Sequence, residues 1–224
     1  EVEFADAYIE ELVVEQLMFG EYTTIYSNDL WGITELTVPA EAKELSDLRH
    51  LLYLEKLSLR DHQIADLSFL TGMTHLKSLD LSGCAISADL SILKTLPALE
   101  ELTMEGCAIS SLAFLEGAPS LKKLDLSRNA IGNLSPLATI PTLQTLDLAD
   151  NAVADTTPLS GLTELTSLNL SEYVLTTIAP LGSCGKLTEL DVSENKLTDI
   201  AAVRTLTGLT SFRAEKNQLT DCSP

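Results

Sequence analysis

LKKLDLSRNAIGNLSPLATIPT, residues 121–142, is the segment that decides the fold of this 224-residue chain. Its apolar residues and one asparagine recur at spacings of two and three, at Leu121, Leu124, Leu126, Asn129, Ile131, Leu134 and Leu137. Similar units begin about every 22 residues, at Ile33, Leu54, Leu76, Leu99, Leu121, Leu143, Leu165, Leu187 and Leu209. A unit of this length cannot bury its apolar edge alone, so the stack of units is the expected folding unit.

Each unit contains a short alternation of apolar and polar residues, which predicts a β-strand with one face toward the core. In the unit that begins at Leu121, Leu124 and Leu126 are expected to face the core. Lys123 and Asp125 then point the other way, toward solvent. The same alternation at positions 4 and 6 of the other units predicts one strand in each.

Prolines mark one register of the unit, and they predict where short turns begin opposite the strands. A residue without an N–H group is tolerated at the start of a helical turn. Ser135 and Thr157 precede two of these prolines and are expected to cap the turns, which we expect to be 3₁₀ rather than α-helical. The unit that begins at Leu76 has one extra residue near Ala88, which predicts a bulge on this side. The prolines of this register are Pro136, Pro158, Pro180 and Pro224.

The ninth position of the unit is asparagine in four copies and something else in the others. An inward amide there can bond to backbone groups that would otherwise be buried without partners, at a cost of roughly 1–3 kcal/mol each. Cys84 and Cys107 replace it in two neighbouring units, either as packed thiols, which we favour, or as a disulfide. Tyr173 cannot fill an amide's space, so its turn is expected to rearrange, with the ring rotated outward or contacting a partner. The asparagines are Asn129, Asn151, Asn195 and Asn217.

Residues 1–32 do not carry the repeat, and they predict a helical cap. Gly20 is expected to end its helix. Such a cap would cover the apolar cross-section and the unpaired backbone edge of the first unit. The predicted organisation is therefore a cap over residues 1–32 and a repeat domain over residues 33–224, with about eight full repeats and an incomplete last one. The apolar side of the predicted helix carries Phe4, Tyr8, Ile9, Leu12, Val13 and Leu17.

The charge of the chain restricts its partners. With 14 basic and 33 acidic residues, the formal net charge is −19. This charge repels nucleic acid and anionic membrane surfaces, so we expect neither as a partner, whereas a protein with a basic surface is compatible with it. No apolar run approaches the roughly 20 residues of a membrane-spanning helix, so direct membrane insertion is not expected.

These residues resemble a known family. The unit L-x-x-L-x-L-x-x-N-x-I-x-x-(I/L)-x-P-L resembles the leucine-rich repeats of bacterial internalins, which are close in type to those of eukaryotic phosphatase-regulating repeat proteins. FADAYIEELVVEQL, at residues 4–17, and TIYSNDLWGITELTV, at residues 24–38, are similar to the helical cap that precedes internalin repeats in surface proteins of Gram-positive bacteria. The resemblance covers essentially the whole chain.

The resemblance implies an α/β leucine-rich-repeat solenoid, a right-handed horseshoe with a parallel β-sheet on its concave face and short 3₁₀ turns on its convex face. It also implies a non-catalytic module for protein binding, recognition or adhesion, secreted or displayed on the bacterial cell surface, with any signal peptide upstream of Glu1. Two alternatives stay open, a structural spacer in a larger surface protein and an intracellular regulatory subunit of the phosphatase-associated type. The last unit has no evident C-terminal cap, so its strand edge is a candidate for self-association.

The concave face carries the candidate binding residues. Asp125 and Asp147 occupy position 5 of neighbouring units, on strands about 4.8 Å apart, and would repel each other. The acidic stripe they belong to is either a solvated face without a ligand, a site for a basic partner, or a calcium site. For a partner that lies in the groove, the candidate contacts are Glu101, Thr103, Glu105, Lys123, Asp125, Arg128, Asp147, Asn169 and Asp191.

Catalysis finds little support in the sequence. His62 falls on the inward ninth position, and His50 and His75 are expected on the far side of the solenoid, so the spacing does not bring the histidines together. No glycine-rich phosphate loop is present. We therefore expect no enzymatic activity, no cofactor and no dedicated metal site.

Overall fold

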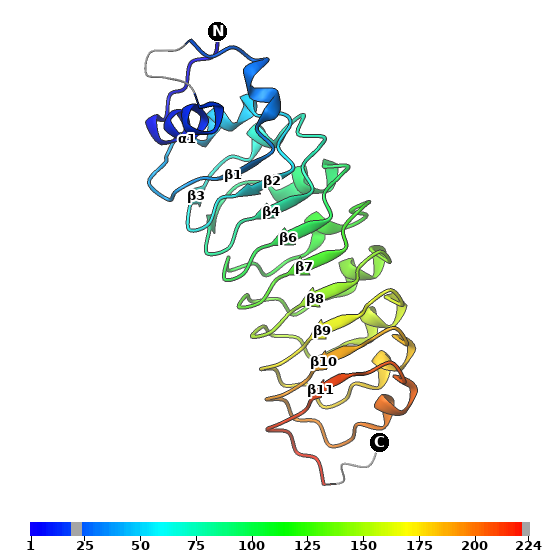
Figure 1. The fold of residues 1–224 in the computed structure, drawn as a ribbon. Helices are drawn as coiled ribbons and strands as arrows, with labels where there is room; N and C mark the ends of the chain where they lie inside the picture. The colour runs from blue at the N-terminus through cyan, green and yellow to red at the C-terminus, as the bar shows by residue number, and fades with distance from the viewer. Residues whose placement is uncertain (19–23, 221–224) are drawn as a thin grey trace.

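The computed structural model describes residues 1–18 and 24–220, which form one curved solenoid with a helix at its N-terminal end (Figure 1). One parallel sheet runs along the whole body, and each strand pairs only with the strands of the neighbouring coils. A second sheet has two short strands, β3 (Gln63–Ile64) and β5 (Ala85–Ile86). The strands of the main sheet are, in order, β1 (Glu35–Thr37), β2 (Lys56–Ser58), β4 (Ser78–Asp80), β6 (Glu101–Thr103), β7 (Lys123–Asp125), β8 (Thr145–Asp147), β9 (Ser167–Asn169), β10 (Glu189–Asp191) and β11 (Ser211–Arg213).

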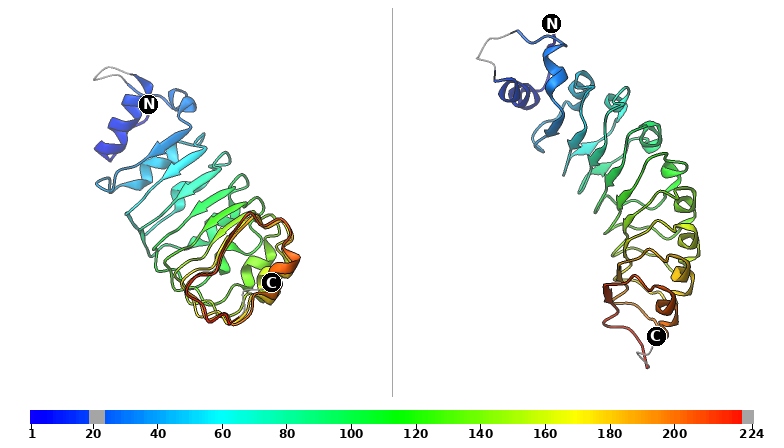
Figure 2. Two further views of the ribbon diagram at one scale, coloured as in Figure 1. Left: turned by 60° about the horizontal axis from the view of Figure 1, so that its bottom comes forward. Right: turned by 45° about the vertical axis from the view of Figure 1, so that its right-hand side comes forward.

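Strands and turns lie on opposite faces of the curve, as the predicted horseshoe requires (Figure 2). The turns are 3₁₀ rather than α-helical, which confirms the expectation from the short unit. Proline is the second residue of η6, η7 and η8. The 3₁₀ turns are η1 (Asp29–Gly32), η2 (Leu45–His50), η3 (Ser68–Leu70), η4 (Leu90–Thr95), η5 (Ala113–Leu115), η6 (Ser135–Thr139), η7 (Thr157–Gly161), η8 (Ala179–Ser183) and η9 (Ala201–Thr205).

The predicted caps of these turns were wrong by two residues. Ser135 and Thr157 are already part of η6 and η7. Their backbone N–H groups donate hydrogen bonds, whereas the side chain of a capping residue would accept one. The acceptors are the side chains of Asn133, at 2.9 Å from Ser135 N, and of Asp155, at 2.8 Å from Thr157 N. An Asn or Asp side chain that bonds to the backbone two residues ahead forms a local turn, and this motif starts the convex segments here.

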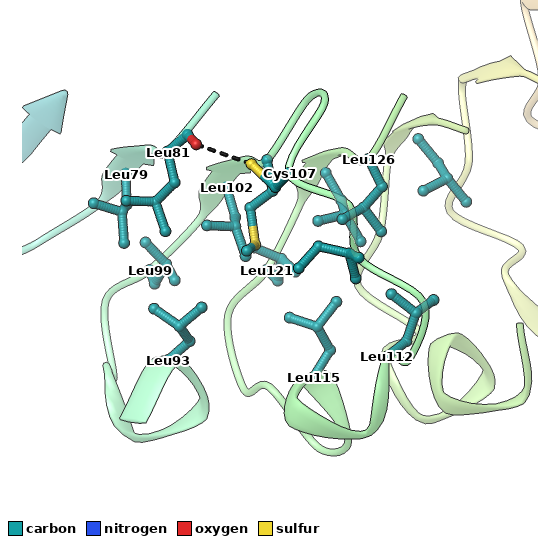
Figure 3. Close-up of a cluster of buried hydrophobic side chains, with 14 of the residues drawn as sticks. Leu79, Leu81, Leu93, Leu99, Leu102, Cys107, Leu112, Leu115, Leu121 and Leu126 are labelled. Carbon is teal, nitrogen blue, oxygen red and sulfur yellow. Dashed lines mark hydrogen bonds between the residues drawn. The ribbon is translucent and has the colours of Figure 1, made fainter. Parts of the chain in front are cut away.

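Leucines fill the space between the sheet and the turns in a single core that extends from the cap to the last complete coil. Figure 3 shows part of it, with Leu79 and Leu102 beneath the strands and Leu93 and Leu115 above the 3₁₀ turns. Each of these side chains is at most 2% exposed. Full burial of one leucine contributes about 1.5–3 kcal/mol relative to exposure, so the repeated leucines dominate the stability of the solenoid.

The extra residue of the third unit lies between β4 and β6, on the part of the coil that runs from β5 past Ala88 into η4, and the bulge stays a prediction. The backbone N–H groups of Ser87 and Ala88 both donate to the carbonyl oxygen of Ile64, at 2.9 and 3.2 Å. Paired donors of this kind also occur in coils that have no inserted residue, as where Lys77 N and Ser78 N both donate to Glu55 O, so they do not mark the insertion by themselves. The inserted residue leaves the register of β4 and β6 intact, with Leu79 still opposite Leu102.

The asparagine ladder works as predicted. The amide nitrogen of Asn129 donates to the carbonyl oxygens of Met104, Leu126 and Ser127, at 2.8–3.1 Å. Its amide oxygen accepts the N–H groups of Cys107 and Ile109 from the preceding coil. One side chain thus ties two coils together where each turns out of its strand.

The cysteines of the ladder are free thiols. The thiol of Cys84 donates to the carbonyl oxygen of Leu59 at 2.8 Å. Figure 3 shows the equivalent bond from Cys107 to the carbonyl oxygen of Leu81, at 3.0 Å. Each sulfur therefore takes over one of the asparagine's bonds to the preceding coil. Burial raises the pKa of the Cys84 thiol to about 11, so it is protonated and a poor nucleophile near neutral pH. Cys222 and Pro224 lie outside the described residues.

The prediction that the Tyr173 ring rotates outward is wrong. The side chain is only 6% exposed and packs into the core, and its hydroxyl has no hydrogen-bond partner among the described residues. The surrounding turn does rearrange. In the coil before it, Ala152 N donates to Ile131 O at 2.9 Å, but the equivalent bond from Val174 to Val153 is missing from the described part of the chain. The ring is too large for an amide's slot, and apolar burial outweighs the cost of its lone hydroxyl.

The cap helix α1 (Ala7–Leu17) buries Ile9 and Val13 against the first coil. The helix ends at Leu17 and is followed by Met18 in a left-handed conformation, with φ 53°. Gly20, the predicted terminator, lies outside the described residues. None of the helices in residues 1–18 and 24–220 is both long and apolar enough to cross a bilayer.

Two buried carboxylates clasp the cap onto the first coil. Asp6 is the N-cap of α1, and its side chain accepts the N–H groups of Tyr8 and Ile9 on one oxygen. Its other oxygen accepts the N–H groups of Lys43 and Glu44, at 2.7 and 3.1 Å. Asp47, which is 1% exposed and lies in η2, accepts the N–H groups of Ala5 and Asp6 in return. The cap is thus joined to the solenoid by hydrogen bonds as well as by apolar contact.

Candidate functional site

Side chains on the concave face stand in rows, because equivalent residues of neighbouring strands lie opposite one another. Asp125 of β7 is paired with Asp147 of β8, Asp147 with Asn169 of β9, and Asn169 with Asp191 of β10. All four side chains are partly buried, while the residues directly before and after each of them, such as Leu124 and Leu126 beside Asp125, face the core. We call these four residues the acidic row. The predicted proximity of Asp125 and Asp147 is confirmed.

Each member of the acidic row also has a structural task. One carboxylate oxygen of Asp125 accepts the N–H group of Ser127 at 3.0 Å and its hydroxyl at 2.7 Å. Asp191 binds Ser193 in the same way, at 2.9 and 2.6 Å. This turn fixes the direction in which the chain leaves the strand. The D-x-S spacing in the sequence is the signal that could have shown it. The turn leaves the second oxygen of Asp125 for a ligand, whereas the second oxygen of Asp191 lies 3.6 Å from Arg213.

Asp147 has an unusual environment within the row. Burial raises the pKa of its carboxyl group, and the neighbouring charges of Asp125 and Asp191 raise it further. The hydrogen bonds from Ala149 N and from the Asn169 amide lower it again, but do not cancel the rise. The Asn169 amide nitrogen lies 3.0 Å from the second carboxylate oxygen of Asp147. The row therefore holds negative charge that a nearby cation would stabilise.

A hollow of about 290 Å³ lies over the C-terminal part of the row. Polar groups dominate its wall. Ser167 donates its hydroxyl to Glu189 at 3.1 Å, and Arg213 lies 3.6 Å from Asp191. The sequence placed the centre of the candidate site further toward the N-terminus, and it did not single out Ser167, Glu189 or Arg213. The hollow is lined by Asp147, Ser167, Leu168, Asn169, Glu189, Leu190, Asp191, Ser211 and Arg213.

The predicted mixed patch in the middle of the array is internally neutralised. Lys123 pairs with Glu101 at 2.6 Å, and Arg128 pairs with Glu105 at 3.1 Å. Arg128 follows β7 in a left-handed conformation, with φ 58°, so it lies beyond the strand rather than on it. Thr103 sits between these pairs, partly buried at the end of β6. All nine predicted contact residues thus lie on or next to the concave strands, but four of the charged ones already bind one another.

Ion pairs in the described residues always join neighbouring coils. Lys56 pairs with Glu35, Lys77 with Glu55, and the remaining pairs likewise connect residues 20–23 positions apart. None of these pairs includes Asp125 or Asp147. The part of the acidic row over β7 and β8 therefore carries charge that no cation of the described chain neutralises by an ion pair.

The histidines have three separate surroundings. His62 is buried in the ladder and bonds through Nδ1 to the carbonyl oxygen of Arg60, as its register predicts. His50 ends η2 and packs edge-on against Phe4. His75 lies exposed between η3 and β4, three residues before the strand, rather than on the far side. No group of three or more potential metal-binding side chains occurs within residues 1–18 and 24–220.

Comparison with known proteins agrees with this architecture along most of the chain. A family model described as the leucine-rich-repeat domain of the endo-β-N-acetylglucosaminidase EndoS matches residues 42–151, and two further leucine-rich-repeat models match residues 141–183 and 183–203. Internalin C2 of Listeria monocytogenes is 30% identical and superposes with a TM-score of 0.86, over 93% of both chains. The chain belongs to the internalin family.

Two other Listeria monocytogenes internalins share the fold of this internalin-type chain. InlF is 26% identical with a TM-score of 0.64, over 97% of this chain and 78% of its own. InlJ, whose functional domain includes a cysteine ladder, is 24% identical with a TM-score of 0.75, over 98% of this chain and 52% of its own. A comparison with curated proteins found no match. Leucine-rich-repeat domains of this kind are protein-binding and recognition modules, and the horseshoe described here has that architecture.

Proposed function

We propose that this internalin-type protein binds another protein through its concave face, and that the partner presents a basic surface to the acidic row. The observation that carries the proposal is the pair Asp125 and Asp147, which lie opposite each other without an ion-pair partner in the described chain. A lysine or arginine from a partner would relieve their repulsion. It could bond to the second carboxylate oxygen of Asp125, whereas that of Asp147 already accepts the Asn169 amide. The hollow beside Asp147 gives such a side chain room.

The test reverses the charge of the row and compares it with an equal change elsewhere. The double variant Asp125→Lys/Asp147→Lys is matched by Glu10→Lys/Glu11→Lys, on the exposed side of α1, so both change the net charge equally. Calorimetric titration with an arginine-rich peptide should show at least about a tenfold loss of affinity for the first variant only. An equal loss in both variants would mean that only the net charge matters, and would overturn the proposal.

Export and surface display belong to the same proposal, as do the roles of adhesion and recognition. The likeness to internalins along almost the whole chain supports them. A signal sequence ahead of Glu1 in the full gene is the expected finding, and it would exclude the intracellular regulatory alternative.

Self-association through β11 is a separate proposal, in which its partly exposed Phe212 pairs with a second copy. Light scattering at the monomer mass at high concentration would contradict it.

A further inference from the structure

Three aromatic rings, one from the cap and one from each of the first two coils, lie in a row at the edge of the sheet where the strands begin. The Trp31 and Tyr53 ring centroids are 5.9 Å apart, with planes inclined at 45°. Those of Tyr53 and His75 are 5.2 Å apart, with planes inclined at 23°. Trp31 lies four residues before β1, and the other two rings lie three residues before β2 and β4. We call this set the aromatic ladder.

The aromatic ladder is exposed although it is apolar. Trp31 is 60% exposed, Tyr53 40%, and the adjacent Leu52 41%. The next coil has Ala98 at the corresponding place, so no further ring covers His75. Tryptophan and tyrosine dominate the binding energy of protein interfaces, because they bury a large area with few rotatable bonds. Exposed rings that are aligned in this way have the character of an interface anchor rather than of ordinary surface.

Charges around the ladder are compensated. Lys56 and Glu35 pair at 2.6 Å, and Lys77 and Glu55 at 2.8 Å, both in the coils that carry the rings. Lysines that are already neutralised do not oppose a basic partner, and the net charge of −19 attracts one. The ladder also lies directly before the first strand residues of the concave face, so one extended partner can reach both surfaces.

From these observations we infer that the aromatic ladder is the apolar anchor point for the protein partner of the concave face, and that it takes a segment in which an apolar or aromatic residue adjoins arginine or lysine. The inference rests on the proposed function and adds its missing hot spot. A peptide with basic residues fits better than a sugar, because the net charge of −19 attracts a basic ligand and a neutral carbohydrate gains nothing from it. Apolar side chains and guanidinium groups can pack on the ring edges and on the uncovered ring at the end.

The experiment selects binders from a random displayed peptide library on the immobilised protein and measures the synthetic peptides by calorimetry. Selected peptides are expected to combine an apolar residue with arginine or lysine, and to change the fluorescence of Trp31, the only tryptophan. Tyr53→Ala should weaken them at least about tenfold. Val174→Ala, which truncates another exposed apolar residue at 50% exposure, is the matched control and should leave them unchanged. Circular dichroism verifies that both variants are folded.

The experiment gives different results depending on whether the aromatic ladder or the acidic row is not a binding site. Peptides that Asp147→Lys weakens but Tyr53→Ala does not would overturn the ladder and leave the proposed function standing. Peptides that neither variant weakens would overturn both. A library without enriched binders, or a neutral oligosaccharide that shifts Trp31 fluorescence where the peptides do not, would also overturn the inference.

Discussion

Single residues of the asparagine ladder contribute more to stability than their size suggests, and Asn195 shows this through four hydrogen bonds. Its amide donates to the carbonyl oxygens of Leu170, Val192 and Ser193 and accepts the N–H group of Leu175, all at 2.8–3.0 Å. It is 6% exposed, so water cannot replace these bonds. The residue is therefore a structural one, although it is polar and lies close to the concave face.

Replacing this asparagine tests the ladder. Asn195→Ala should lower the free energy of unfolding by about 2–3 kcal/mol, because it leaves buried backbone groups without partners. Asn133→Ala is the control, since that exposed side chain makes one bond, to Ser135 N, and should cost about 0.5–1 kcal/mol. Denaturant unfolding measures both values. Equal losses would show that the ladder position adds nothing beyond a local turn.

At the scale of elements, the cap is held by Asp6 and Asp47, and their role is local to one junction. Asp6→Ala should lower the free energy of unfolding by about 1–2 kcal/mol, since it removes the N-cap of α1 and its two bonds to the first coil. Amide exchange of α1 should rise more than that of β7 to β10. Glu10→Ala, on the exposed side of the same helix, should change neither. Uniform loss of protection along the chain would contradict this local role.

The same carboxylate makes the junction sensitive to acid. Burial alone would raise the pKa of Asp6, but the hydrogen bonds from Glu44, Lys43, Ile9 and Tyr8 outweigh it and hold the pKa below its ordinary value. A lowered pKa stabilises the fold above the pKa of the unfolded chain, about 3.9, and this stabilisation is lost as the pH falls through the lower folded value. The α1 amides should lose protection from hydrogen exchange as the pH falls from the unfolded pKa through the lower folded pKa. Asp6→Ala should remove this dependence on pH.

For the whole molecule, the net charge decides how stability depends on salt. The ion pairs between coils are exposed and contribute little, whereas a charge of −19 on one elongated body repels itself. Raising sodium chloride from about 0.05 M to about 0.5 M should therefore raise the Tm, since screening weakens the repulsion more than the pairs. A Tm that falls with salt would mean that the ion pairs dominate.

Much of the candidate site could be read from the repeat register, because residues one unit apart lie on neighbouring strands. This register placed Asp125 beside Asp147 and put the nine candidate residues near one face. It did not show that Lys123 and Arg128 are already paired, because the pairing depends on side-chain rotamers of exposed residues. The aromatic ladder was missed for a different reason. Its rings precede the strands by three or four residues, outside the alternating pattern that defines the unit.

By itself, the sequence determined the solenoid, its strands, its 3₁₀ turns and its asparagine ladder, since apolar periodicity and backbone hydrogen bonding leave one way to bury such a unit. Only the tertiary structure decided the direction of Tyr173, the hydrogen bonds of Asp6 and Asp47, the partners of the charged residues and the stacking of Tyr53 on His75. These features depend on how much space each coil leaves for its neighbour. That space is fixed by packing between residues far apart in the chain, and no local pattern encodes it.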